Sequence, residues 1–216
     1  MKYQLIVFDW DGTLLDSAGA IVQAIQSACI DLSLPVPEDS QARHVIGLGL
    51  VDAMRHAVPD LPPERYQAMV DRYRYHYLAG DHKLTLFDGV PQMLERLHAA
   101  GHILAIATGK SRLGLDRALD HSGLRPLFQA SRCADECHSK PHPQMLEELM
   151  AEFCMAEAST VMIGDTSHDL LMASNAGVDA LAVTYGAHPH NHLVEHKPAA
   201  CLHSIQELDQ WLLNFA

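Results

Sequence analysis

The sequence lacks a long apolar run, a cluster of basic residues and an internal repeat. No run approaches the roughly 18–20 apolar residues that a membrane-spanning helix needs. The first carboxylate comes at Asp9, too early for the apolar stretch of a signal peptide. Lys and Arg total 15 against 27 Asp and Glu, a formal net charge of -12 that repels a nucleic-acid backbone. We therefore expect a soluble, cytoplasmic protein without a membrane or nucleic acid as partner.

Disulfide pairing is not indicated either, because the chain has 5 cysteines and no CxxC pair. This pattern favours a reducing compartment over a disulfide scaffold. Four Cys and His residues lie close in sequence, but their spacing matches no standard zinc pattern, so we interpret them as ordinary loop and strand residues. They are Cys133, Cys137, His138 and His142.

With 48% apolar residues among its 216, the chain can build an ordinary buried core. Short apolar runs predict buried strands, and helical spacing of apolar residues predicts helices between them. Strands that alternate with helices indicate an α/β fold with a mainly parallel sheet, whose carboxyl ends bind ligands. The predicted strands are 5–8, 103–107, 161–163 and 180–183, and the predicted helices are 90–100, 113–121, 143–152 and 169–176.

Residues 17–85 show helical patterns and no convincing strand. Ser17 is placed to cap a helix that runs to about Ser33, and further helical patterns cover 52–57 and 64–78. We therefore predict a helical insert between the first two strands. The division would be a catalytic core at 1–16 and 86–216 and a helical domain at 17–85.

The first predicted strand ends in Phe8-Asp9-Trp10-Asp11-Gly12-Thr13. Two carboxylates this close repel each other unless a cation lies between them, and Mg²⁺ prefers such oxygen ligands. Asp9 can then attack phosphorus to give an acyl-phosphate. Asp11 can protonate the leaving alcohol and later deprotonate water. The alternative is a structural turn, in which Asp and Gly are common.

Three later segments carry groups that could bind the same metal ion or the phosphate. In Gly164-Asp165-Thr-Ser-His-Asp169, both carboxylates can face the same metal ion, although Asp169 could simply cap the following helix. Thr108-Gly109-Lys110 follows a predicted strand and offers a hydroxyl and backbone N–H groups to a phosphoryl oxygen. Lys140, held between Ser139 and Pro141, can neutralise phosphate charge.

In this order, DxDGT at 9–13, Thr108, Lys140 and GDxxxD at 164–169 resemble the four signature motifs of the haloacid dehalogenase superfamily. The resemblance spans nearly the whole chain. The helical insert falls where the C1 type of cap sits in that superfamily. Val45-Ile-Gly47-Leu-Gly49 and Lys140-Pro-His-Pro143 are similar to the phosphoglycolate-phosphatase-like branch, in subfamily IA.

The resemblance implies a Mg²⁺-dependent phosphatase that acts on a small phosphorylated metabolite through an aspartyl-phosphate. It implies a Rossmann-like three-layer core under a mobile α-helical cap. The family often has Asn after the Thr of the second motif, so Gly109 is a departure, for which Lys110 could substitute electrostatically. The implied roles are nucleophile for Asp9, general acid/base for Asp11, phosphate binding for Thr108 and Lys140, substrate binding for Gly109, Lys110 and Arg43, and metal binding for Asp9, Asp11 (through its carbonyl), Asp165 and Asp169.

Several alternatives stay open. A phosphosugar mutase uses the same core carboxylates, and a binding protein could keep the fold without turnover. Asp11 argues against a true dehalogenase, and a phosphonatase would need a cap lysine where only Lys83 is present. Four of the 15 histidines could suggest metal storage, but we interpret their tract as a solvated surface; they are His188, His190, His192 and His196. For the oligomeric state a monomer is the default, and a dimer stays open.

Overall fold

The computed structural model describes residues 2–216, and its centre is a six-stranded parallel sheet in the order β3-β2-β1-β4-β5-β6. Every residue of β1 is fully buried, as expected for a strand with neighbours on both sides and helices on both faces. The strands are β1 Leu5–Phe8, β2 Ile103–Thr108, β3 Ala130–Cys133, β4 Thr160–Gly164, β5 Asp179–Val183 and β6 Ala200–Leu202.

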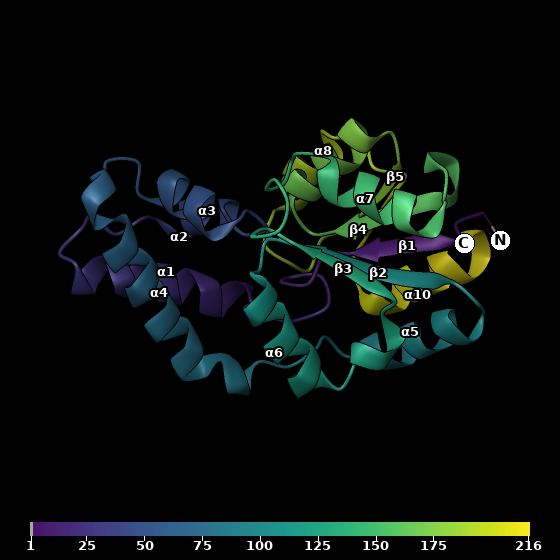
Figure 1. The fold of residues 1–216 in the computed structure, drawn as a ribbon, viewed down its shortest axis with the longest axis horizontal. Coiled ribbons are helices and arrows are strands. Elements are labelled where there is room, and N and C mark those ends of the chain that lie inside the picture. Colours follow the sequence, from purple (N-terminus) through teal and green to yellow (C-terminus); the bar gives the residue numbers. More distant parts are fainter. Residues whose placement is uncertain (1) are drawn as a thin grey trace.

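Helices cover both faces of the sheet (Figure 1). Alternate side chains of β1 point to opposite faces. Ile6 and Phe8 join an apolar cluster with α5 (Val90–Ala99), α6 (Arg112–Ser122) and α10 (Ile205–Phe215). Leu5 and Val7 join another with α7 (Gln144–Phe153), α8 (Ser167–Ala176) and α9 (His190–Val194). This arrangement confirms the predicted Rossmann-like three-layer core.

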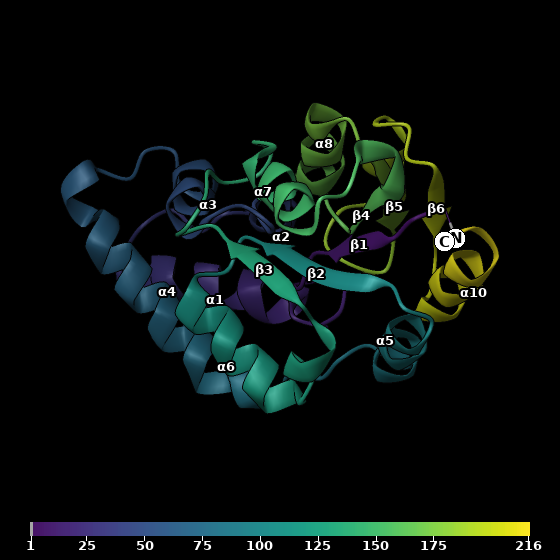
Figure 2. The ribbon, with the colours of Figure 1, turned by 45° about the vertical axis from the view of Figure 1, so that its right-hand side comes forward.

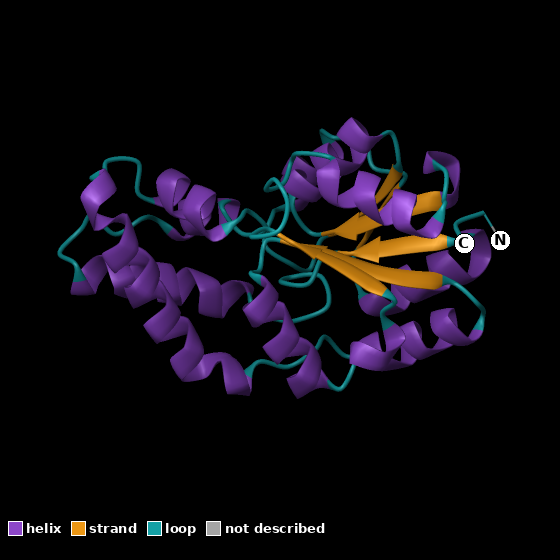
Figure 3. Ribbon diagram, viewed as in Figure 1, coloured by secondary structure: helices purple, strands orange, loops and turns teal. Residues whose placement is uncertain are grey.

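Residues 18–83, here called the helical unit, contain helices and no strand (Figure 3). Helices α1 and α4 pack along each other, and an apolar cluster formed by this unit and Ala187 of the core surrounds Ile25, Met54 and Met69. The unit is built from α1 (Ala18–Asp31), α2 (Asp39–His44), α3 (Leu50–Ala57) and α4 (Tyr66–Gly80), with 3-10 turns η1 (Pro63–Arg65) and η2 (Asp81–Lys83). Two further 3-10 turns, η3 (Arg125–Leu127) and η4 (Glu157–Ser159), lie in the core.

The helical unit lies beyond the carboxyl ends of the strands, toward which the strand arrows point in Figure 3. The chain enters and leaves it at one place. Asp16 N–H donates to the carbonyl of Thr85 at 3.0 Å, and Phe87 N–H donates to that of Leu14 at 3.0 Å. The same separation of sheet and helical unit is visible after rotation (Figure 2). Among residues 2–216, no helix is both long enough and apolar enough to cross a membrane.

Candidate active site

The pairing of β1 with β2 and β4 brings three predicted site segments together at the carboxyl ends of these strands. Phe8 pairs with Ile106 of β2 on one side and with Ile163 of β4 on the other. Asp9 and Asp165, one and two residues beyond these pairs, therefore emerge at neighbouring strand ends, and Thr108 ends β2 beside them. The structure thus unites residues that are more than 150 positions apart in the sequence.

Three buried carboxylates converge there. Oxygen atoms of Asp9, Asp165 and Asp169 all lie within 4.8 Å of one another, and each of the three residues is fully buried. Within residues 2–216, neither carboxylate oxygen of Asp9 receives a hydrogen bond. Burial raises the pKa of Asp9 to about 7; nearby Lys140 opposes the rise and Asp169 adds to it. Such a site fits a hard divalent cation, because a cation removes the repulsion and supplies partners for the free oxygens.

Asp165 is held tightly from several sides. Its carboxylate accepts hydrogen bonds from the Thr13 hydroxyl at 2.8 Å and from the backbone N–H of Ala187 at 2.7 Å. A β-carbon on Gly12 or on Gly186 would come within 2.2 Å of its Oδ2 atom, so only glycine permits this packing. Burial, together with the charges of the other two carboxylates, raises the pKa of Asp165 well above its usual value. Gly186 and Ala187 were not predicted as site residues, since neither carries a chemical side chain.

Lys140 lies inside the carboxylate cluster. Its side chain is fully buried, and its Nζ atom lies 2.8 Å from Asp9 Oδ1 and 2.6 Å from Asp169 Oδ1. The contact with Asp9 is an ion pair without the direction of a hydrogen bond, whereas Lys140 donates a hydrogen bond to Asp169. Burial lowers the pKa of Lys140, but the two carboxylates outweigh that effect and the net pKa is raised. This lysine is therefore a buried cation at the site.

Asp169 caps α8 and also faces the carboxylate cluster, two positions that the sequence left as alternatives. It closes a capping box at the start of α8, where its Oδ2 atom accepts from the Thr166 N–H at 3.1 Å and from the Thr166 hydroxyl at 2.7 Å. Its Oδ1 atom faces Lys140 and belongs to the carboxylate cluster. Capping fixes the rotamer that places the carboxylate there.

The Asp11 side chain lies outside the carboxylate cluster. Its Oδ1 atom accepts a hydrogen bond from the Ser17 hydroxyl at 2.6 Å, and its Oδ2 atom lies 2.9 Å from Lys110 Nζ. The prediction that the Ser17 side chain caps α1 is wrong: Ser17 occupies the N-cap position, but its side chain makes no capping hydrogen bond. The hydroxyl orients Asp11 instead.

The second motif joins the core to the helical unit. The Thr108 hydroxyl, which is buried, accepts a hydrogen bond from Lys110 N–H at 3.3 Å. Lys110 Nζ donates to the Tyr77 hydroxyl of α4 at 3.0 Å. Burial lowers the pKa of Lys110, but Asp11 and then Tyr77 outweigh that effect, so the net pKa is raised. Lys110 is thus a charged bridge between Asp11 and the helical unit.

Comparison with known proteins places this arrangement in a family. The family model described as haloacid dehalogenase-like hydrolase matches residues 6–183. The chain is a haloacid dehalogenase-like hydrolase. It is 36% identical over 210 residues to the protein named probable phosphatase IndB of Dickeya dadantii, covering 94% of this chain and 91% of that protein. It is 33% identical over 192 residues to a phosphoglycolate phosphatase of Aliivibrio fischeri, with 85% of each chain covered.

A crystal structure described as a predicted phosphoglycolate phosphatase from Haemophilus somnus has the same fold. It superposes with a TM-score of 0.87 at 25% sequence identity and covers 98% of this chain and 99% of its own. The family match and these relatives confirm the resemblance seen in the sequence. They also confirm the enzyme class predicted there, a phosphatase of the haloacid dehalogenase type.

The site of this haloacid dehalogenase-like hydrolase opens into a cavity of about 860 Å³ between the core and the helical unit. Asp9, Asp11, Thr108, Gly109 and Lys110 all line it. Arg43, the expected substrate contact, is half-buried on α2 and is not among the described residues that line the cavity. The structure therefore brings every other predicted residue to the cavity or the carboxylate cluster beneath it, but not Arg43.

His188 differs from the surface tract that its sequence neighbours suggest. His190 and His192 are exposed, but His188 is 2% exposed, and its Nδ1 atom accepts a hydrogen bond from Ser167 N–H at 3.0 Å. The Nε2 atoms of His188 and His168 lie 3.2 Å and 2.8 Å from the carbonyl oxygen of His44, on α2. Burial lowers the pKa of His188 to about 4. The surface interpretation is therefore wrong for this residue, which links the helical unit to the first residue of α8.

The Cys and His residues at 133–142 do not form a metal site. Cys133 is buried in the apolar core, while Cys137 approaches Glu148 at 3.8 Å. Across residues 2–216, Asp9, Asp165 and Asp169 are the one group of acidic, Cys or His side chains close enough to share an ion.

Proposed function

We propose that the chain is a Mg²⁺-dependent phosphatase that hydrolyses a small phosphate monoester through an aspartyl-phosphate. The observation that carries this proposal is the convergence of Asp9, Asp165 and Asp169, all buried, with both oxygens of Asp9 free of hydrogen bonds among the described residues. A carboxylate that lies beside a cation and whose oxygens are not engaged in hydrogen bonds is suited to nucleophilic attack.

The proposed metal ligands are the side chains of Asp9, Asp165 and Asp169 and the backbone carbonyl of Asp11. Bound there, Mg²⁺ would supply charge that offsets both the carboxylates and the phosphoryl group. Lys140 adds a second positive charge, because its Nζ atom lies 2.8 Å from Asp9. Most of the catalytic effect in phosphoryl transfer comes from such positioning and charge stabilisation.

The proposed reaction has two steps. In the first, an oxygen of Asp9 bonds to phosphorus, the ester P–O bond breaks, and Asp11 gives its proton to the leaving alcohol. In the second, Asp11 takes a proton from water, the water oxygen bonds to phosphorus, and the bond to Asp9 breaks to release phosphate. Thr108 and the backbone N–H groups after it would bind the phosphoryl oxygens, with Gly109 and Lys110 next to the substrate.

Residues 17–85 would act as a cap over a core formed by 1–16 and 86–216. Closure of the cap excludes water other than the attacking molecule and fixes the leaving group. We propose small phosphorylated metabolites of the cytoplasm as substrates and a monomer as the working unit. Nucleic acid and membranes are not expected as partners, because the net charge of -12 opposes binding to phosphate-rich surfaces.

The test is phosphate release from a panel of small phosphate esters with Mg²⁺, with EDTA, and with Ca²⁺ in place of Mg²⁺. We expect release with Mg²⁺ alone, because the looser coordination of Ca²⁺ suits the site poorly. Asp9→Asn should lower the rate by roughly 10⁴-fold or more with the fold retained. Asp60→Asn, at an exposed position, is the matched control and should keep full activity.

Two outcomes would contradict the proposal. Substantial turnover by Asp9→Asn would remove the covalent mechanism. Accumulation of phosphorylated enzyme that passes its phosphoryl group to a sugar phosphate, without release of inorganic phosphate, would indicate a mutase.

A further inference from the structure

The cavity above Asp9 is walled mainly by apolar side chains of the helical unit. Its floor carries the reactive groups of the core. Most of its walls come from α1, α3, α4 and the loop at 45–49, and α6 and the core segment 134–139 complete them. Apart from Asp52, Gln67 and Arg74, these walls offer a polar or charged leaving group few partners. The wall residues include Ile25, Val45, Ile46, Leu48, Met54 and Val70.

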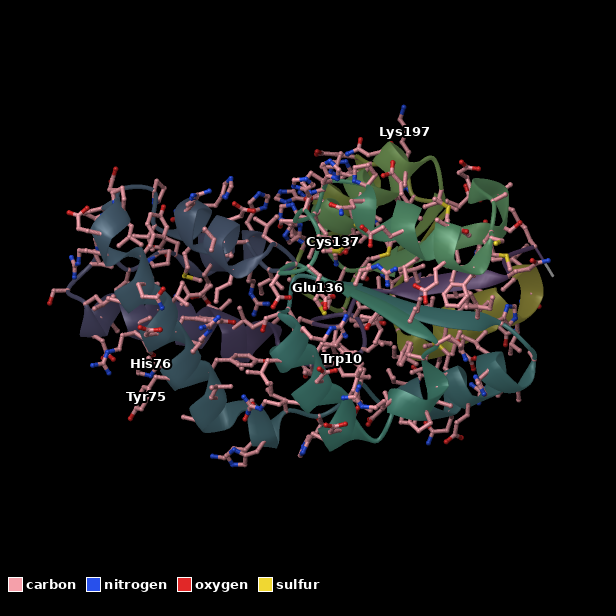
Figure 4. The ribbon with its side chains drawn as sticks, viewed as in Figure 1. Trp10, Tyr75, His76, Glu136, Cys137 and Lys197 are labelled. Atoms are coloured by element: carbon pink, nitrogen blue, oxygen red, sulfur yellow. The ribbon has the colours of Figure 1, made fainter. Side chains whose placement is uncertain are left out.

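Helix α4 adds two stacked aromatic rings to the same wall. Tyr73 and Tyr77 lie one helical turn apart and line the cavity, with ring centroids 5.8 Å apart and planes 20° from parallel. Tyr75, between them in sequence, is 64% exposed and points away from the ribbon with His76 (Figure 4). The helix therefore presents one aromatic face to the cavity.

The cavity has this size while the core and helical unit are in contact. The Gly49 N–H donates to the Ser139 hydroxyl at 2.8 Å, and Lys110 donates to Tyr77 at 3.0 Å. About 860 Å³ is near the upper end for small-molecule sites and far exceeds the needs of a two-carbon acid. The cavity therefore has a volume of about 860 Å³ when the core and the helical unit are in contact.

The two lysines near the reaction centre, Lys140 fully buried and Lys110 half-buried, are already paired. Lys140 lies between Asp9 and Asp169, and Lys110 lies 2.9 Å from Asp11. Arg117, farther out, is ion-paired with Asp81. Within residues 2–216, the one other lysine or arginine that lines the cavity is Arg74 of α4, which is exposed. A carboxylate on a short leaving group would therefore lack an unpaired buried cation.

Exposed apolar side chains continue the wall to the mouth of the cavity. Leu113 is 73% exposed and Val51 is 52% exposed, and both line it. Large apolar side chains exposed beside a functional cavity are typical of surfaces that contact a ligand.

We propose that the substrate is a phosphate monoester whose leaving group has a large, uncharged, ring-containing body that packs against Tyr73 and the apolar walls. This inference rests on the proposed phosphatase function and names its substrate class. Short acidic esters such as phosphoglycolate are poor substrates, because they leave the apolar walls in water and bring an unpaired carboxylate into the cavity.

The first test compares kcat/KM for benzyl phosphate, glycerol 3-phosphate and phosphoglycolate, which are all phosphate esters of primary alcohols. Benzyl phosphate should be preferred by roughly 10- to 100-fold, the factor that corresponds to burying one aromatic side chain. Phosphoglycolate hydrolysed as well as, or better than, benzyl phosphate would overturn this inference and leave the proposed phosphatase function intact. No hydrolysis of any ester by folded protein would overturn both.

Two pairs of variants locate the effect. Tyr73→Leu should raise KM for benzyl phosphate by about 3- to 10-fold, whereas Tyr73→Phe, which keeps the ring, should not. Leu113→Ala should raise the same KM, and Leu213→Ala, 60% exposed on α10 on the far side of the core, should leave it unchanged. An unchanged KM in both Tyr73→Leu and Leu113→Ala would overturn the inference.

Discussion

Gly109 of the core packs directly against Gly47 of the helical unit. A β-carbon on Gly109 would lie 2.5 Å from the carbonyl oxygen of Gly47 and 2.5 Å from that of Leu48. The family often has Asn at this position of the second motif. The close packing against the loop at 45–49 gives a physical reason for the glycine in this sequence. Without a side chain at 109, the loop at 45–49 can lie directly on the second motif.

Gly109→Ala should therefore weaken the closed arrangement. Backbone displacement from overpacking costs about 1–3 kcal/mol, so we expect kcat/KM to fall by roughly 5- to 100-fold. The control is Gly19→Ala in α1, where an added β-carbon meets nothing within 4 Å. That variant should keep full activity and gain slight stability. Equal activity in the two variants would show that close packing at Gly109 is not needed.

Lys140→Met should impair both stability and catalysis. The lysine offsets two buried carboxylates, and removing one partner of such an arrangement costs about 3–5 kcal/mol. We expect kcat to fall by at least roughly 100-fold, measured with saturating Mg²⁺, and urea midpoints to fall as well. Lys197→Met is the matched control, because Lys197 is exposed and projects from the surface in Figure 4. Its stability should change by about 0.5 kcal/mol or less.

The stability of the metal-free protein should decrease as pH rises. Burial raises the pKa of Asp9 from 3.8 to about 7 and also raises that of Asp165. The native state therefore holds these protons more tightly than the unfolded chain does, and the stabilisation they give is lost as pH rises through about 7. The lowered pKa of the buried His188 acts in the opposite direction below about pH 6.5. We therefore expect the Tm in EDTA to fall between about pH 6.5 and about pH 8.

Added Mg²⁺ should raise the Tm more at the higher of these pH values, because protons compete with the metal for the same oxygens. Thermal unfolding with and without Mg²⁺ at both pH values measures this. Asp9→Asn should show a weaker dependence on both. A Tm that rises with pH in EDTA would contradict the assignment of the raised pKa to these buried carboxylates.

His188→Ala should destabilise the loop that begins α8. The change leaves the buried N–H of Ser167 without its acceptor and removes a contact to the carbonyl of His44. A buried donor without a partner costs about 1–3 kcal/mol, so the free energy of unfolding should drop by that amount. His192→Ala, at an exposed position four residues farther on in α9, should change it by about 0.5 kcal/mol or less. Equal urea midpoints for the two variants would refute the structural role of His188.

The sequence predicted the central strands well and missed the edges of the sheet. The predicted strand at 5–8 coincides with β1, because a strand buried on both faces is a continuous apolar run. β3 reads Ala-Ser-Arg-Cys and is mostly half-buried, and β6 has only 3 residues. Both lie at the ends of the strand order, where one side needs no apolar residues. Helix α10 was also not predicted.

The sequence singled out side chains with chemistry of their own that converge in the structure, and it did not indicate residues that are defined by their neighbours. Asp9, Asp165 and Lys140 stand beside strand ends or chain breakers, which gives a local signal. Tyr77 reaches Lys110 only because α4 folds back over the core. His188 belongs to a histidine tract, and no local pattern separates it from its exposed neighbours. A contact between segments that are far apart in the sequence cannot be predicted from the spacing of residues within either segment.

The helical unit is joined to the core by two adjacent chain crossings, held by the hydrogen bonds of Asp16 with Thr85 and of Phe87 with Leu14. Both of its ends therefore attach to the core at the same place. The groups proposed for phosphoryl chemistry lie almost wholly in the core, and most of the walls that would select the leaving group lie in the helical unit. A helical unit transplanted from a relative at these two crossings should therefore transfer its substrate preference while the reaction itself stays unchanged.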